Sequence, residues 1–141
     1  MAIITIVGAG MMGSAMSFPA RDNGHEVRLV GTPLDREIIE RLRTDRYHLH
    51  MKRTLPEGVR LYQIEEMTDA LSGADLLIGG VSSFGVDWFA ENVLPVIPAS
   101  LPVLSITKGL HGKPDGSLVP FPAYYYEKTG RTELSLNCVG G

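Results

Sequence analysis

The chain has 141 residues, of which 44% are hydrophobic and 21% charged, and its formal net charge is −3. This length corresponds to one domain, and the charge lacks the basic excess that nucleic acid or an anionic membrane surface would attract. We therefore expect no nucleic-acid partner. The single cysteine, Cys138, excludes an internal disulfide, agrees with a reducing compartment, and is expected to be a buried strand residue.

The N-terminus has no charged segment ahead of an apolar one, and its apolar run over residues 3–7 is shorter than that of a secretion signal. Nowhere does the sequence contain about 18 consecutive apolar residues. We therefore predict a cytoplasmic protein without membrane insertion.

A glycine motif directly follows the first predicted strand, residues 3–7, whose β-branched side chains suit a central parallel strand. The glycines that fit the spacing G-x-G-x-x-G are Gly8, Gly10 and Gly13. A helix over residues 11–22 and a second strand over residues 26–30 complete the βαβ context that this motif requires. The context favours a bound dinucleotide over a glycine-rich helix entry that holds no ligand.

Each position of the motif has its own role in this prediction. Gly8 permits a tight turn, Gly10 lets the backbone approach a pyrophosphate, and Gly13 lets the helix pack closely on the strand. The free N–H groups of Met11 and Met12 would point at the anion.

The end of the second strand bears on which dinucleotide binds. A strict NAD binder usually has Asp or Glu here to hold the ribose hydroxyls of adenosine, whereas residues 30–32 are Val, Gly and Thr. Without that carboxylate a 2′-phosphate is not repelled, and Thr32 with Arg36 could contact it. The equally weighted alternative is that Thr32 only caps the next helix and that Arg36 is solvated.

The helix that follows Thr32 is amphipathic and is expected to dock on the sheet. Its predicted apolar face comprises Leu34, Ile38, Ile39 and Leu42, and its polar face carries an ion pair between Glu37 and Arg41. In the preceding helix, Pro19 leaves the carbonyl of Ala15 without a donor, so we expect the last turn to kink.

The rest of the chain alternates short apolar runs with segments of helical period. Strands are predicted over residues 59–62, 76–81, 103–106 and 134–138, and helices over residues 67–71, 86–93 and 123–128. This alternation predicts an α/β fold, a Rossmann-type doubly wound and mostly parallel sheet in three layers. Such a sheet binds its ligand outside the carboxyl ends of its strands, where Ser82-Ser83, Thr107-Lys108-Gly109 and Gly140-Gly141 also stand.

Lys108 is the candidate catalytic residue, because a lysine at the end of a buried strand can bind a phosphorylated or carbonyl substrate through its charge. The alternative is an ordinary solvent-exposed lysine.

A basic segment, residues 46–53, contains His48 and His50 and invites a metal or phosphate interpretation. No third ligand stands at metal-ligand spacing, so a solvated face is favoured and we predict no metal site. The three tyrosines at residues 124–126 are predicted to serve packing or an interface rather than base stacking.

Several segments together resemble, in order and spacing, the N-terminal domain of NAD(P)-dependent glycerol-3-phosphate dehydrogenase. They are "GAGMMGSA", "NGHEVRLVG", "ALSGADLLIGGVSS", "ITKGL" and the closing "CVGG". The glycine motif is shared with related reductases, whereas Thr-Lys-Gly-Leu at the end of the fifth strand is more specific.

The resemblance implies an enzyme that interconverts dihydroxyacetone phosphate and glycerol 3-phosphate with NADP or NAD. Positions that match cofactor contacts are Met11, Met12, Thr32 and Lys108, and those that match substrate contacts are Lys108 and Gly141. We add Arg36 and Ser82 to the cofactor positions. The family usually has a serine and an aromatic residue in place of Met11 and Met12, and a proline in place of Ser82. It usually has a residue other than proline at the position of Pro19.

The family also has a second, all-helical domain with most of the substrate contacts, which the resemblance implies is absent from this chain. Two alternatives remain open on the residues alone. One is a non-catalytic NAD(P)-binding sensor or partner-binding module. The other is a relative that reduces another small keto acid, such as ketopantoate.

Overall fold

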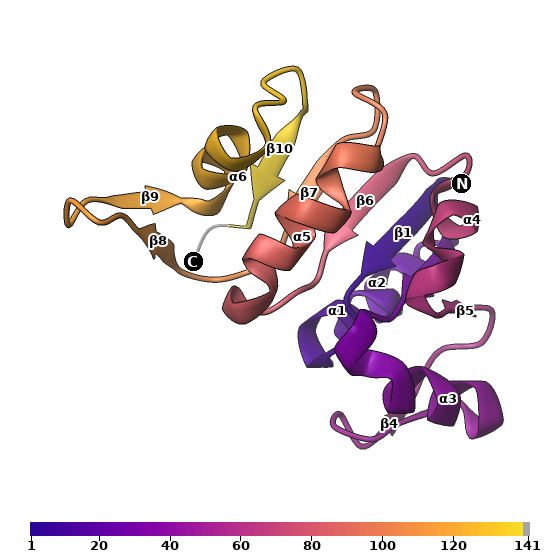
Figure 1. The fold of residues 1–141 in the computed structure, drawn as a ribbon. Helices are drawn as coiled ribbons and strands as arrows, with labels where there is room; N and C mark the ends of the chain where they lie inside the picture. The colour runs from indigo at the N-terminus through magenta and orange to yellow at the C-terminus, as the bar shows by residue number, and fades with distance from the viewer. Residues whose placement is uncertain (140–141) are drawn as a thin grey trace.

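The computed structural model describes residues 1–139, which form a parallel sheet of six strands covered by helices (Figure 1). Across the sheet the strands are β10 (Leu136–Cys138), β7 (Val103–Ser105), β6 (Leu76–Gly79), β1 (Ile3–Val7), β2 (Glu26–Val30) and β5 (Arg60–Tyr62). All neighbouring strands pair in parallel. Each strand predicted from sequence is present, with its ends within two residues of those expected.

The strand order reverses direction at β1, since the chain first builds outward to β2 and β5 and then returns to β6 on the other side. In doubly wound sheets, this switch point is where the carboxyl ends of two neighbouring strands leave a crevice. The glycine motif directly follows β1, so it lies at the switch point.

Helices cover both faces of the sheet, which confirms the predicted three layers. The α-helices are α1 (Met11–Ala15), α2 (Ser17–Asp22), α3 (Arg36–Asp45), α4 (Met67–Leu71), α5 (Val86–Asn92) and α6 (Phe121–Thr129). Short 3-10 turns are η1 (Pro33–Asp35), η2 (Ile64–Glu66), η3 (Ser83–Gly85) and η4 (Leu94–Val96).

Two hydrophobic clusters fill the spaces between these layers. Successive strand residues point to opposite faces, so Val7 joins the cluster under α5 and α6, whereas Ile6 joins the cluster under α3. Both side chains are fully buried. Apart from Thr5, the central strand is apolar on both faces because both faces are covered.

The first helix is interrupted at Met16, which divides it into α1 and α2. Pro19 has no N–H to donate to the carbonyl of Ala15, so the regular pattern fails one turn ahead of the proline rather than in the last turn. Ser17 donates its hydroxyl to the carbonyl of Ser14 at 2.6 Å, which holds the two pieces together.

Two antiparallel hairpins were not predicted: β3 (Tyr47–His48) with β4 (Arg53–Thr54), and β8 (Leu110–Gly112) with β9 (Leu118–Pro120). Their strands are two or three residues long, too short to give a clear alternating pattern. The β8–β9 hairpin extends away from the sheet beside α6 (Figure 1).

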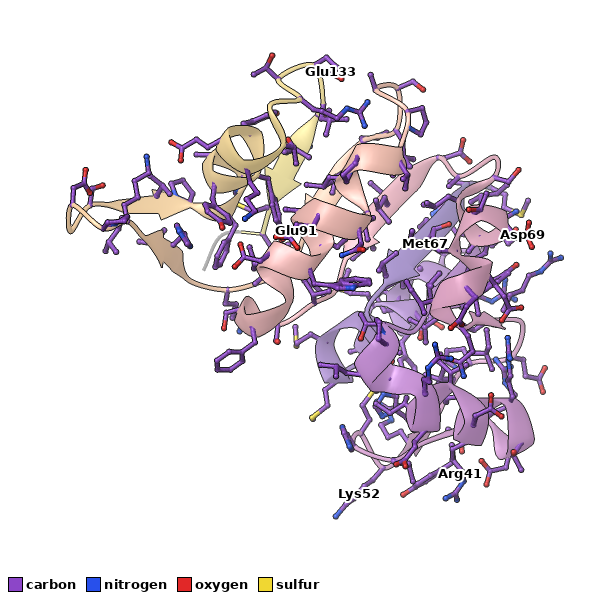
Figure 2. The ribbon with its side chains drawn as sticks, viewed as in Figure 1. Arg41, Lys52, Met67, Asp69, Glu91 and Glu133 are labelled. Carbon is purple, nitrogen blue, oxygen red and sulfur yellow. The ribbon has the colours of Figure 1, made fainter. Side chains whose placement is uncertain are left out.

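Three expectations about side chains are wrong. Cys138 lies in a strand but is exposed, because β10 is an edge strand. Leu34 is 93% exposed, because it belongs to the turn η1 and not to the apolar face of α3. Arg41 pairs with Asp45, one turn later, at 2.9 Å. Figure 2 shows Arg41 and Lys52 pointing outward at the periphery.

Candidate functional site

The glycine motif brings β1, α1 and the end of β6 into backbone contact. A Cβ at Gly13 would lie 2.0 Å from the carbonyl oxygen of Gly8, and one at Gly80 would lie 2.8 Å from the Cα of Gly13. Gly8 also has φ +114°, a left-handed conformation that favours glycine. No side chain fits at these three positions, so the close packing expected of Gly8 and Gly13 is present.

Gly10 differs from its neighbours, since a Cβ there would meet nothing within 4 Å. It precedes α1, whose first N–H groups have no carbonyl one turn earlier to bond. The open space beside Gly10 can therefore admit an anionic group close to the backbone. Gly80 was missed from sequence, although the pair Gly79-Gly80 at the end of a predicted strand was a usable signal.

Side chains from three elements hold the residue between these glycines, Ala9. Its N–H donates to Asp35 Oδ2 at 2.9 Å, and its carbonyl lies 2.7 Å from His48 Nε2 and accepts from Ser14 Oγ at 3.0 Å. The expectation of a solvated face is wrong for His48, which is fully buried. The β3–β4 hairpin folds its side chain against residues 8–10, here called the glycine loop. His50 is exposed.

A first pocket of about 390 Å³, here the Phe84 pocket, opens between the ends of β1, β2 and β6. Its lining includes Gly10, Thr32, Asp35, Gly80, Ser82 and Trp88. Leu34 and Phe84 also line it and are 93% and 97% exposed, so two large apolar side chains stand at its rim. Phe84 was missed from sequence because it sits in the turn η3 with no motif around it.

Thr32 caps the turn η1, which is one of the two alternatives predicted for it from the sequence. Its Oγ1 accepts from the N–H of Leu34 at 3.3 Å, while Asp35 Oδ2 accepts from the N–H of Thr32 at 2.9 Å. Asp35 therefore places a carboxylate at this end of β2, three residues beyond Thr32, where the sequence has no Asp or Glu at residues 30–32. That oxygen already accepts from Ala9 and from both donors of Thr32.

Arg36 is half-exposed and pairs with Glu65 of η2, rather than being only solvated. The hydrogen bond between the two side chains raises the pKa of Arg36 and lowers the pKa of Glu65. Both groups stay charged at neutral pH, so an anion that approaches Arg36 must compete with Glu65.

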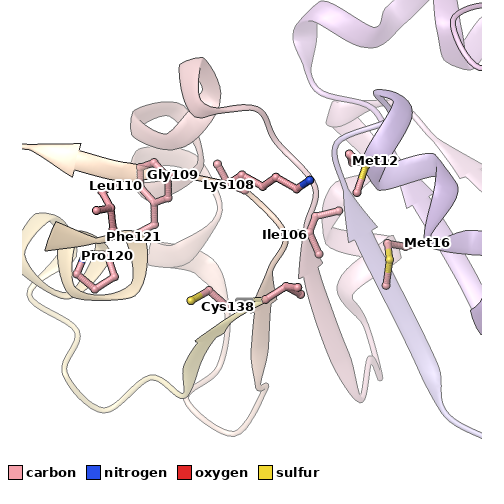
Figure 3. Close-up of a pocket in the computed structure, with 11 residues that line it drawn as sticks. Met12, Met16, Ile106, Lys108, Gly109, Leu110, Pro120, Phe121 and Cys138 are labelled. Atoms are coloured by element: carbon pink, nitrogen blue, oxygen red, sulfur yellow. The ribbon is translucent and has the colours of Figure 1, made fainter. Parts of the chain in front are cut away.

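A second pocket of about 330 Å³, here the Lys108 pocket, lies on the other side of the glycine loop. Its lining includes Met12, Met16, Thr107, Lys108, Phe121 and Cys138. Figure 3 shows Met12 and Met16 of the α1–α2 segment facing the strand ends, with the Lys108 ammonium directed toward Met12. The buried Thr107 hydroxyl donates to the carbonyl of Val81 at 2.6 Å, which ties the ends of β7 and β6 together just before Lys108.

The structure thus brings most of the predicted site residues together at the carboxyl ends of the strands. Gly8, Gly10, Thr32 and Ser82 line the Phe84 pocket, and Met12 and Lys108 line the Lys108 pocket. Met11 is exposed beside Gly10, and Arg36 directly follows Asp35, which lines the Phe84 pocket. Gly141 lies outside the described residues.

Three other predictions from the sequence concern metal ligands, the tyrosines at residues 124–126 and membrane insertion. Within residues 1–139, no three His, Cys, Asp or Glu side chains gather as metal ligands would. The tyrosines serve packing: Tyr125 is buried against Phe89, Tyr126 donates to the carbonyl of Leu134, and Tyr124 bonds to Asp87, which raises the pKa of Tyr124 to about 12. None of the helices in the described part of the chain is long and apolar enough to cross a membrane.

Residues 3–120 match the family model of the N-terminus of NAD-dependent glycerol-3-phosphate dehydrogenase. The chain belongs to this family. The NADP(+)-dependent glycerol-3-phosphate dehydrogenase of Archaeoglobus fulgidus is 40% identical over 108 residues, which are 77% of this chain and 32% of that enzyme. The glycerol-3-phosphate dehydrogenase [NAD(P)+] of Shouchella clausii is 31% identical over 76% of this chain and 31% of its own length. The chain therefore spans about a third of these curated relatives.

Solved structures of glycerol-3-phosphate dehydrogenase share the fold. The Saccharomyces cerevisiae enzyme matches with a TM-score of 0.76 and 14% identity, over 98% of this chain and 41% of that one. A ketopantoate reductase from Ralstonia eutropha matches with a TM-score of 0.59 and 20% identity, over 96% and 39%. Since the fold is common to both kinds of enzyme, the family match and not the fold separates them.

Proposed function

We propose that this chain is the dinucleotide-binding domain of a glycerol-3-phosphate dehydrogenase and that it binds NADP or NAD across the switch point of its sheet. The observation that carries the proposal is the open backbone at Gly10, with one pocket on each side of it. A dinucleotide is a diphosphate with a nucleoside at each end, and this arrangement matches that shape.

The two pockets suit different halves of the ligand. The pyrophosphate would lie at Gly10, Met11 and Met12, where backbone N–H groups are available. The adenine would enter the Phe84 pocket, whose rim presents Leu34 and Phe84 to a planar ring. The nicotinamide would then reach the Lys108 pocket at the other side of the loop.

When bound, the nicotinamide supplies or accepts the hydride of the reaction. Residues of this chain would bind and orient it, and the exposed ammonium of Lys108 would attract the phosphate or the carbonyl oxygen of the substrate. Gly141 would meet the same substrate. Dihydroxyacetone phosphate and glycerol 3-phosphate are the proposed substrate pair, since the relatives carry that activity in their names.

The whole activity would need more than this domain. The relatives are about three times as long as the matched segment, and the remaining substrate contacts would come from a helical domain outside residues 1–141. We place the enzyme in the cytoplasm, because an exposed thiol such as Cys138 suits a reducing compartment.

A titration with NADPH and NADH, followed by fluorescence, tests the proposal. We expect the unmutated chain to bind at least one of them and Gly10→Val to lose binding, because the new side chain would fill the space of the pyrophosphate. Gly112→Val, in the β8–β9 hairpin, is the matched control and should bind normally. Equal binding by Gly10→Val and the unmutated chain would contradict the proposal.

A further inference from the structure

The imidazole of His48 reaches the glycine loop from the β3–β4 hairpin, 39 residues further along the chain. We propose that His48 is a positioning residue for dinucleotide binding, which it supports by fixing the peptide between Ala9 and Gly10 without touching the ligand. The inference rests on the proposed function.

The hydrogen bonds of the ring determine its tautomer. Nδ1 accepts from the backbone N–H groups of His50 at 3.2 Å and Met51 at 3.1 Å, so this nitrogen must present its lone pair. The ring proton is therefore on Nε2, which lies 2.7 Å from the carbonyl oxygen of Ala9. His48 thus donates to Ala9 as a neutral imidazole.

The held carbonyl belongs to the same peptide unit as the N–H of Gly10. Because a trans peptide is planar, its C=O and N–H point in opposite directions, and fixing one fixes the other. Ser14 Oγ donates to the same carbonyl at 3.0 Å. Together, His48 and Ser14 draw the oxygen inward, so the Gly10 N–H is directed outward, toward the open space where the diphosphate is proposed to lie.

The preceding peptide unit is held as well, since the N–H of Ala9 donates to Asp35. Two successive peptides of a glycine-rich loop are therefore fixed by side chains before any ligand arrives. Glycine loses more conformational freedom on ordering than other residues, so a loop ordered in advance binds more tightly than a mobile one. The full burial of His48 and Ala9 keeps water from competing for the bond.

Substitutions of equal length can separate the hydrogen bond from the packing. His48→Gln keeps a donor near the position of Nε2, whereas His48→Met fills similar space without a donor. His48→Asn keeps an acceptor for the amides of residues 50 and 51 but is too short to reach Ala9. Leu55→Val is the control, because Leu55 is buried beside the same hairpin and its side chain makes no hydrogen bond.

Two measurements apply to each variant of the 141-residue protein. The first is the Kd for NADPH and NADH. The second is amide hydrogen exchange at Ala9 and at Ser14, whose N–H bonds to the carbonyl of Gly10, and it needs no ligand. In the unmutated chain, ¹⁵N NMR of the His48 ring should give a protonated Nε2 and an unprotonated Nδ1.

We expect His48→Met to bind the dinucleotide about tenfold more weakly, as the loss of one buried hydrogen bond predicts, with faster exchange at Ala9 and Ser14. His48→Gln should stay within about twofold of the unmutated chain in Kd, and Leu55→Val should leave the exchange at both amides unchanged. If His48→Met does not fold, faster exchange in His48→Asn than in His48→Gln supports the inference.

Equal behaviour of the donor and non-donor variants would overturn the inference, as would a proton on Nδ1. Failure of the unmutated chain to bind either dinucleotide would instead count against the proposed function. The exchange comparison would still decide whether His48 fixes the loop.

Discussion

The glycine loop and the residues around Lys108 at the end of β7, here called the Lys108 edge, flank the same crevice but are built by different means. At the loop the proposed binding surface is backbone, and Ala9 is fully buried between hydrogen-bonding side chains. At the other edge the proposed binding groups are side chains, and Lys108 is exposed near Leu110 and Val139, which are 56% and 54% exposed.

The two sides of the crevice therefore differ in what holds their shape. The shape of the loop is set by backbone contacts that the described residues supply in full. The Lys108 edge instead offers an exposed charge and open apolar surface. We therefore expect substitutions at the loop to change folding and binding, and substitutions at Lys108 to leave both the fold and its stability unchanged.

The largest effect is expected at Gly13. Gly13→Ala would force a Cβ to 2.0 Å from the carbonyl oxygen of Gly8, so β1 and α1 must separate. We expect the free energy of unfolding to fall by about 3 kcal/mol, the upper range for overpacking. Urea unfolding measures this, with Gly10→Ala as the matched control.

At Gly10 the new Cβ meets nothing within 4 Å, so the control should change stability by less than about 1 kcal/mol. If both alanine variants unfold at the same urea concentration, the distinction between a packing glycine and a ligand-facing glycine is wrong.

A smaller effect is expected at Thr107, one residue from the exposed lysine. Thr107→Val removes the donor to the buried carbonyl of Val81, and an unsatisfied buried acceptor costs about 1 to 3 kcal/mol. Lys108→Met should change stability by less than about 0.5 kcal/mol, because the side chain is exposed. Thermal unfolding of both variants checks the contrast, and a larger loss in Lys108→Met would refute it.

The smallest effect concerns the ion pair between Arg36 and Glu65. Glu65→Gln removes the carboxylate that competes for Arg36, so NADPH should bind roughly two- to fivefold more tightly while NADH is unaffected. The gain should shrink at high salt, since both side chains are exposed. Titrations at two ionic strengths test this, and an equal gain for NADH would show that Arg36 does not contact the 2′-phosphate.

Thr32→Asp is the companion variant at the end of β2. A second carboxylate beside Asp35 should disfavour the 2′-phosphate and turn the preference toward NADH. An unchanged ratio of the two dissociation constants would mean that the 2′-phosphate lies elsewhere.

The sequence predicted the central strands well because β1, β6 and β7 are short, largely buried apolar runs. The run at residues 3–7 and the glycine spacing each act over a few neighbouring residues, and the structure has the corresponding strand and turn. The glycine loop could be predicted for the same reason.

The missed features depend on contacts between distant residues. His48 in a polar segment looks solvated until the hairpin folds it onto the carbonyl of Ala9, and Asp35 looks like a simple helix-capping residue until its carboxylate accepts from the N–H of Ala9. Leu34 fits the apolar period of α3, yet the turn η1 rotates it out to the rim of the Phe84 pocket. Local periodicity cannot contain this information.

The central claim is that one dinucleotide spans both pockets across Gly10. The most direct measurement is an NMR titration of the ¹⁵N-labelled chain with NADPH, compared with 2′,5′-ADP and nicotinamide mononucleotide. We expect 2′,5′-ADP to shift the amides around Phe84 and Gly10 only, the mononucleotide to shift those around Lys108, and NADPH to shift all of them with one Kd. Shifts around Lys108 with 2′,5′-ADP, or NADPH shifts that spare Gly10, would contradict the account.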